Sequence, residues 1–128
     1  MVGLFLKTGS NMGYYTAYGL EIIPDKGYAS EIEEFEKELI DYSENDCEVE
    51  ELVKTGGCYG KLYDITDWIS KLAPKFPHIL ICLGGDGEES DDLWETRWKG
   101  SETETQTSVI PPFNNPNLLT EYEKKNNK

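Results

Sequence analysis

Residues 80–89 read LICLGGDGEE, an apolar run that leads into a glycine-rich turn carrying acids. With the two residues before it, the run is HILICL, which has the length of one strand and no alternation of apolar and polar side chains. A strand with this pattern is covered on both faces and belongs in the middle of a sheet. We therefore expect residues 78–83 to form the central strand, with the glycines giving a tight exit from it.

Three other segments have the composition of strands. Residues 14–23, YYTAYGLEII, alternate at period two and are rich in aromatic and β-branched side chains. Residues 93–99, LWETRWK, place Trp94 and Trp98 on one face, where we expect them in the core beneath helices. Residues 102–109 alternate threonine with polar side chains and suit an exposed edge strand. A further strand over residues 2–7 would pair with residues 14–23 through a turn at 8–11.

Two helices are expected from apolar spacing and capping patterns. Ser30 and Glu33 form a capping-box pattern ahead of a helix over residues 30–42, with Ile32, Phe35, Leu39 and Tyr42 on its apolar face. Asp64 and Asp67 form a weaker version of the same pattern ahead of a second helix that ends at Pro74 or shortly before it.

Residues 47–53, CEVEELV, allow two interpretations. They could extend a helix, or they could form the first strand of a hairpin that turns at residues 54–57 and returns as CYGKLY. We choose the hairpin. The expected element order is then β-α-β-β-α-β followed by a hairpin.

This order predicts an α+β fold, a ferredoxin-like (split βαβ) single domain over residues 1–109 with a mainly antiparallel sheet and two helices on one face. From residue 110 the chain becomes rich in proline and asparagine, which predicts an extended arm over residues 110–128. Apolar side chains in the arm provide docking contacts, either on its own domain or on a neighbour; they are Ile110, Phe113, Leu118, Leu119 and Tyr122.

The chain is strongly acidic, with 25 Asp and Glu against 12 Lys and Arg and a formal net charge of −13. This charge disfavours direct contact with nucleic acid or an anionic membrane, so we expect a basic partner. No run is long enough to cross a bilayer. Three cysteines without a CxxC pair, and no secretory leader, indicate free thiols in a reducing, cytoplasmic location.

The glycine turn at residues 84–87 is a poor phosphate loop because acids crowd it. Each carboxylate close to a phosphate would contribute repulsion of about 1 kcal/mol or more. The GGDG sequence is similar to the GGDGT of kinases acting on NAD or diacylglycerol and to the GGDEF of diguanylate cyclases, but Glu88 departs from both. An EF-hand starting at Asp86 fails because Asp91 replaces the required glycine. We expect no enzyme, no cofactor and no metal site; a metal-assisted enzyme is the third alternative.

Residues 62–100 resemble small proteins of phages, bacteria and large DNA viruses, some of them grouped with the YubB-like ferredoxin-like domains. The shared pattern is a Tyr-Asp step, a short helix, Phe-Pro, an apolar strand, a Gly-x-Gly-Glu-Glu turn, an acid before Leu-Trp and a closing glycine. The matching positions are Tyr63, Asp64, Phe76, Pro77, Gly85, Gly87, Glu88, Glu89, Asp92, Trp94 and Gly100. The resemblance implies a fold and brings no catalytic residues.

Two functions follow as hypotheses. The first is a non-enzymatic acidic protein-binding module, an inhibitor, nucleic-acid mimic or accessory factor that engages a basic protein surface. Its expected partner-binding residues are Asp86, Glu88, Glu89, Asp91 and Asp92 in the loop and Glu31, Glu34 and Glu38 on the outer helix face. The alternative is a structural subunit of a larger assembly such as a virus particle, docked through its arm. The location would be the host cytoplasm or the virion if the protein is viral.

Overall fold

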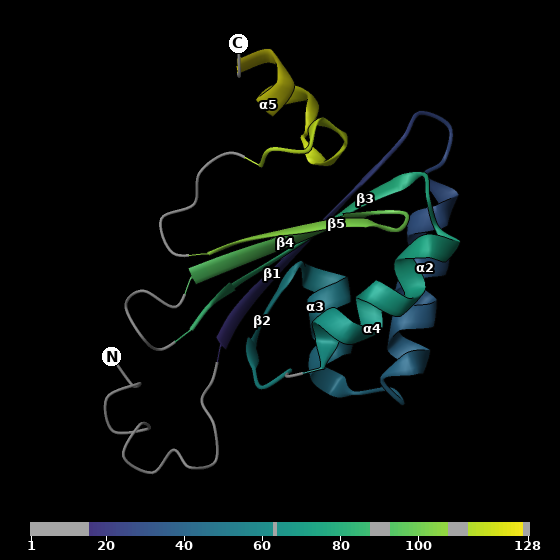
Figure 1. The fold of residues 1–128 in the computed structure, drawn as a ribbon. Helices are drawn as coiled ribbons and strands as arrows, with labels where there is room; N and C mark the ends of the chain where they lie inside the picture. Colours follow the sequence, from purple (N-terminus) through teal and green to yellow (C-terminus); the bar gives the residue numbers. More distant parts are fainter. Residues whose placement is uncertain (1–15, 63, 88–92, 108–112, 127–128) are drawn as a thin grey trace.

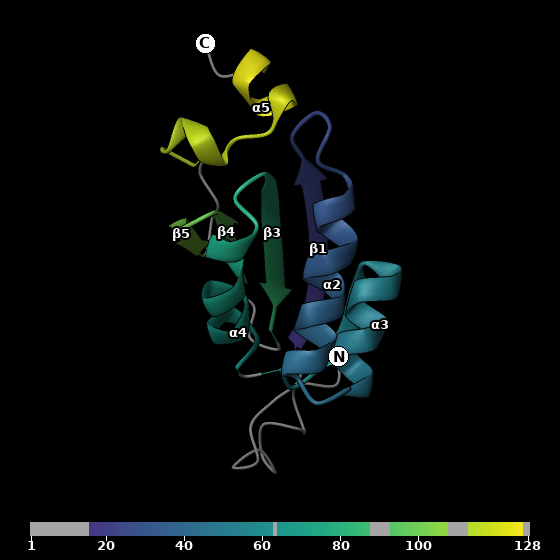
Figure 2. The ribbon, with the colours of Figure 1, turned by 90° about the vertical axis from the view of Figure 1, so that its right-hand side faces the viewer.

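The computed structural model describes residues 16–62, 64–87, 93–107 and 113–126. These residues form an α+β fold in which helices cover one face of an open sheet and the C-terminal segment lies on the other face (Figures 1 and 2). The strands are β1 (Thr16–Pro24), β2 (Gly57–Gly60), β3 (Ile79–Asp86), β4 (Leu93–Lys99) and β5 (Glu102–Thr107). The helices are α2 (Ser30–Tyr42), α3 (Cys47–Thr55), α4 (Ile65–Leu72) and α5 (Glu121–Asn126), with short 3-10 turns η2 (Ala73–Lys75) and η3 (Pro116–Leu118).

The sheet has the strand order β2-β1-β3-β4-β5, and every neighbouring pair is antiparallel. β3 is therefore the central strand, as its apolar run predicts. Ile81 lies opposite Ile22 of β1 and Trp98 of β4, which fixes the register of the three middle strands. β5 is an edge strand, as predicted. The expected strand over residues 2–7 lies outside the described residues.

The main core lies between the sheet and the three helices α2, α3 and α4. From the sheet it takes the side chains of β1, β3 and β4 that share one face, including Tyr18, Ile81 and Trp98. From the helices it takes Phe35 and Ile69, which are fully buried. The apolar spacing of residues 30–42 and 65–72 thus gives helices because each buries one stripe on the sheet.

A smaller core lies on the opposite face of β3. Leu80 and Cys82 point away from the helices and are buried by Leu118 of η3, with Ile23 packed beside them. Both faces of the central strand are therefore covered, and residues from the C-terminal segment provide the second cover. This segment is not simply extended, because η3 and α5 form within it. A capping box opens α5: the Thr120 amide donates to Glu123 Oε1 at 2.8 Å, and the Glu123 amide donates to Thr120 Oγ1 at 3.1 Å.

The predicted hairpin with residues 47–53 as its first strand is wrong, because residues 47–55 form the helix α3. Asp46 caps this helix, its Oδ1 accepting from the amides of Glu48 at 2.8 Å and Val49 at 3.2 Å. Gly56 ends the helix with a positive φ of 84°. Three helices therefore cover the sheet where two were predicted, and β2 pairs with β1 instead of with residues 47–53.

Two other local expectations also differ from the structure. Ser30 lies inside α2 and Asp64 precedes α4, but neither helix has a side-chain hydrogen bond at its N-cap. The expected capping boxes are therefore not formed, and burial of the apolar stripes stabilises these helices. The glycines at 84 and 85 do not form an exit turn, because β3 continues through them to Asp86.

Candidate functional site

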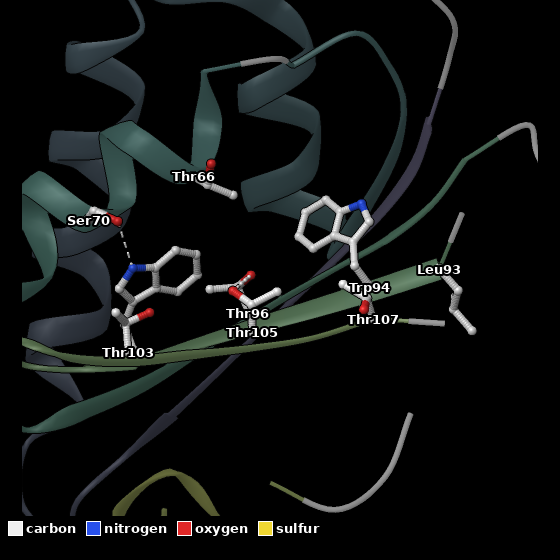
Figure 3. A pocket seen from close by; sticks show the side chains of 9 residues that line it. Thr66, Ser70, Leu93, Trp94, Thr96, Thr103, Thr105 and Thr107 are labelled. Atoms are coloured by element: carbon white, nitrogen blue, oxygen red, sulfur yellow. Dashed lines mark hydrogen bonds between the residues drawn. The ribbon is translucent and has the colours of Figure 1, made fainter. Parts of the chain in front are cut away.

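A groove of about 530 Å³ lies on the helical face of the sheet, between α4 and the last two strands (Figure 3). Its volume is within the range of pockets that hold a small molecule or a side chain, roughly 300–1,000 Å³. Aromatic, aliphatic and hydroxyl side chains line it: Thr66, Ser70, Leu93, Trp94, Thr96, Trp98, Thr103, Thr105 and Thr107. Within the described part of the chain this lining has no charged side chain, although the chain carries a net charge of −13.

Trp94 is positioned by a glycine of the neighbouring strand. Gly85 lies opposite Trp94 in the β3–β4 ladder, and a Cβ on Gly85 would come within 3.0 Å of three indole atoms. Tyr18 of β1 meets the same indole edge to face, with ring centroids 6.3 Å apart. The indole therefore leans across Gly85, and the half-buried ring also lines the groove.

Hydrogen bonds hold the other groove side chains. Trp98 Nε1 donates to Ser70 Oγ of α4 at 3.0 Å, which ties the sheet to the helix wall (Figure 3). The hydroxyl oxygens of Thr96 and Thr105 lie 2.8 Å apart across the β4–β5 ladder. Trp98 is buried in the core as predicted. The threonines of β5 point to the groove because alternate residues of a strand share a face. Their alternation in the sequence is the signal that could have predicted this shared face.

The acidic surface predicted on residues 30–42 extends over α3. Residues 30–55 carry eleven acidic side chains and only two lysines. Of the three glutamates predicted to bind a partner, Glu34 is exposed. Glu31 accepts from the amide of His78 at 3.4 Å, and Glu38 forms an ion pair with Lys75 at 2.6 Å. Glu31 and Glu38 thus contact their own chain near the start of β3.

Several carboxylates of this surface are exposed and have no ion pair within the described part of the chain; they are Glu33, Glu34, Asp41, Glu44 and Glu51. Partial burial, together with repulsion from Glu33, raises the pKa of Glu36. We call the surface formed by Glu33, Glu34, Asp41, Glu44 and Glu51 the acidic helical surface. The α3 part of this surface does not follow from the expected secondary structure, in which residues 47–53 form a strand.

The predicted acidic loop lies at the other end of the sheet. Asp86 is exposed and is the last residue of β3, whereas the Glu31 contact is made just before β3 begins. Eight strand residues separate these ends by about 24 Å. The structure therefore does not bring Asp86 and Glu31 together. Glu88, Glu89, Asp91 and Asp92 lie outside the described residues.

The predicted docking residues of the arm contact the domain of their own chain. Phe113 is buried, with the Arg97 guanidinium 4.4 Å from its ring centroid, and Leu118 is fully buried. Leu119 is half-buried. Ile110 and the side chain of Tyr122 lie outside the described part. Polar contacts on β5 add to this docking: Asn115 Nδ2 donates to Glu102 Oε1 at 2.9 Å, and the Asn115 amide donates to Glu104 Oε1 at 3.2 Å.

Arg97 of β4 is the polar centre of this docking. Its guanidinium donates to Glu95 Oε2 at 2.8 Å, to Glu123 Oε1 at 2.7 Å and to the Leu118 carbonyl at 2.9 Å. Burial acts to lower the pKa of Arg97, but the hydrogen bonds to Glu123 and Glu95 raise it above its ordinary value. The same hydrogen bond from Arg97 lowers the pKa of Glu123. The arrangement holds a charge pair in place and does not leave a free reactive group.

The described residues hold no group of three His, Cys, Asp or Glu side chains that would suit a metal ion. His78 stacks on Tyr28 with ring centroids 3.8 Å apart, and its Nδ1 lies 3.7 Å from Asp25 Oδ2. Burial raises the pKa of Cys58 to about 11 and that of Cys82 to about 12, so neither thiol is an activated nucleophile.

Comparisons with protein-family models, with curated proteins and with solved structures find no match to this chain. Among the described residues, no helix has the length and apolar composition that crossing a bilayer requires. The acidic helical surface and the groove are therefore the two features of the described residues from which we infer a function.

Proposed function

We propose that this protein is a non-enzymatic acidic protein-binding module whose acidic helical surface engages a basic partner. The observation that carries the proposal is the set of exposed carboxylates on α2, on α3 and in the turn between them that have no ion pair with any described residue. The two lysines of this segment do little to compensate them, since Lys54 already pairs with Glu50 at 3.2 Å. A basic protein surface supplies the missing charge.

Electrostatics of this kind act mainly on the rate and selectivity of association. A surface of one sign steers an oppositely charged partner toward it and repels partners of like charge. The steering decreases as salt shortens the Debye length, which is about 8 Å at physiological ionic strength. An inhibitor, a nucleic-acid mimic or an accessory factor would each use such a surface against a basic target.

We further propose that the domain is a variant of the ferredoxin-like arrangement. β2 and β3 both run antiparallel to β1, so they are parallel to each other with β1 between them, and α4 connects them. This connection is a split βαβ unit. In the variant, α3 occupies the chain position of the second strand. The arrangement supports our proposal that the domain is related to the YubB-like domains. We also propose that the protein is located in the cytoplasm or in a virus particle.

The role of a structural subunit docked through the arm stays a second prediction. Phe113 and Leu118 are already buried on their own sheet. An assembly contact would therefore have to use other arm residues or begin with release of the arm. The protein-binding module is favoured because the residues of its acidic helical surface are exposed.

Affinity capture from the native source, with the intact protein as bait, tests the proposal. The bait is compared with a Glu33→Gln, Glu34→Gln variant and with a Glu21→Gln, Glu121→Gln control of equal charge change. We expect a basic protein that is retained at low salt, released at high salt and lost only with the first variant. Equal retention by both variants, or retention that salt does not weaken, would overturn the proposal.

A further inference from the structure

We infer that the groove between α4, β4 and β5 receives an arginine side chain of the basic partner. This inference rests on the proposed function and deepens it, because it names a contact that the acidic helical surface does not provide. The groove lies on the other side of α4 from α2, so one partner could reach both regions across that helix (Figure 2).

The groove offers an aromatic surface and hydroxyl oxygens, and these are the groups that a guanidinium uses. Trp94 is half-buried and lines the groove, and a cation placed over an indole is attracted by the ring quadrupole. Ser70 Oγ accepts from Trp98 Nε1, and the Thr96 and Thr105 hydroxyls pair with each other. The hydroxyls of Thr66, Thr103 and Thr107 have no side-chain hydrogen bond within the described residues and can accept the guanidinium N–H groups.

The charge around the groove selects a cation. Among the described residues, no lysine or arginine lines the groove, so an anion would meet no counter-charge from them and would be repelled by a chain of net charge −13. An exposed acid, Asp67, follows the groove residue Thr66 on α4. The single base of α4, Lys71, follows Ser70, whose hydroxyl accepts from Trp98 and not from Trp94.

Arginine fits these walls better than lysine. A guanidinium is planar, stacks on aromatic rings and is more weakly hydrated than an ammonium, so it loses less on entering a groove without a carboxylate. Its five donors also suit a site with hydroxyl acceptors on two sides. Arginine and tryptophan are the residue types most enriched where protein interfaces gain their affinity.

The test uses N-acetyl-arginine methyl ester as the probe, with the neutral N-acetyl-citrulline methyl ester as its near-isosteric control. Binding to the full chain is followed by the indole N–H signals of Trp68, Trp94 and Trp98 in a two-dimensional NMR spectrum. We expect a saturating shift at Trp94, no comparable shift at Trp68, and binding of citrulline weaker by roughly threefold to tenfold, as the loss of one cation–π contact implies. Equal binding of the two probes, or no change at Trp94, would overturn the inference.

Variants separate this inference from the proposed function. Trp94→Leu and the milder Trp94→Phe should weaken the arginine probe in that order, whereas Glu33→Gln with Glu34→Gln should leave it unchanged. With the captured partner, both the Trp94 and the glutamate variants should lose affinity. If only the glutamate variants do so, the groove inference fails and the protein-binding function stands; if neither does, both fail.

Discussion

Trp94 lies across Gly85, so that a single methyl group added at residue 85 would overlap the indole. The two residues are direct partners in the β3–β4 ladder. The glycine pair in LICLGGDGEE therefore serves the packing of a tryptophan, and only its second member has this task.

Gly85→Ala should lower the free energy of unfolding by about 1–3 kcal/mol, the usual cost of overpacking. The indole must move, so the tryptophan fluorescence and the groove should change with it. Gly84→Ala is the matched control, because its Cβ would meet the Trp94 carbonyl oxygen at an ordinary 3.6 Å. Chemical denaturation of both variants checks the prediction, and equal losses would contradict it.

Arg97→Met should detach the C-terminal segment from the sheet. The substitution removes the hydrogen bonds to Glu123 and to the Leu118 carbonyl and leaves Glu95 without its partner. We expect a loss of about 1–3 kcal/mol and faster hydrogen exchange at the Leu118 amide. Lys99→Met on the same strand removes a more exposed pair with Asp25 and should cost less than 1 kcal/mol. Unchanged exchange of the Leu118 amide in Arg97→Met would show that Arg97 does not hold the C-terminal segment on the sheet.

Docking of the arm should weaken in acid. Because the hydrogen bond from Arg97 lowers the pKa of Glu123 in the folded protein, Glu123 contributes stability above the ordinary carboxyl pKa of 4.5. That contribution is lost as pH falls through the lowered value. The free-energy difference between the parent and Glu123→Gln should therefore be present at neutral pH and shrink in acid. A pH series of denaturation curves measures it, and a constant difference would be inconsistent with this linkage.

Asp46→Ala should destabilise the protein by about 1 kcal/mol, because Asp46 caps α3 through two amides. Asp64→Ala is the control, since Asp64 precedes α4 without a capping hydrogen bond from its side chain. Thermal unfolding of the two variants should show the larger loss for Asp46. A larger loss for Asp64 would mean that the cap assignment is mistaken.

The three cysteines should differ in reactivity. Cys47 is exposed, whereas Cys58 and Cys82 are buried with raised pKa values. At pH 8 a thiol reagent should modify one cysteine quickly, and Cys47→Ser should remove that fast phase. Denaturant should release the other two. Rapid labelling of Cys82 in the native protein would show that the Leu118 cover opens readily.

The sequence predicts well those elements whose apolar pattern is compatible with only one secondary structure and one position in the fold. HILICL has no polar face, so it had to be central, and residues 30–42 bury a stripe at helical spacing. LWETRWK places Trp98 and Arg97 on opposite faces of the sheet by simple alternation, and the structure buries both side chains. These assignments depend on local periodicity alone.

The assignments that failed depend either on signals just outside a segment or on contacts far along the chain. CEVEELV is compatible with a strand or a helix, and the decisive signals were the cap at Asp46 and the stop at Gly56, just outside the segment. The groove depends on the order of the strands and on the position of α4, and the spacing of residues within one segment predicts neither. The buried pair between Arg97 and Glu123 joins residues 26 positions apart, so no short motif announces it.

The contacts of the arm with Glu102 and Glu104 bear on self-association. An open sheet has two outer strands whose backbone groups can template pairing with another chain. β2 offers only four residues, but β5 offers six. Release of the arm would also uncover Leu80 and Cys82 on the central strand. By covering these two side chains, the C-terminal segment keeps apolar surface of the sheet out of reach of another chain.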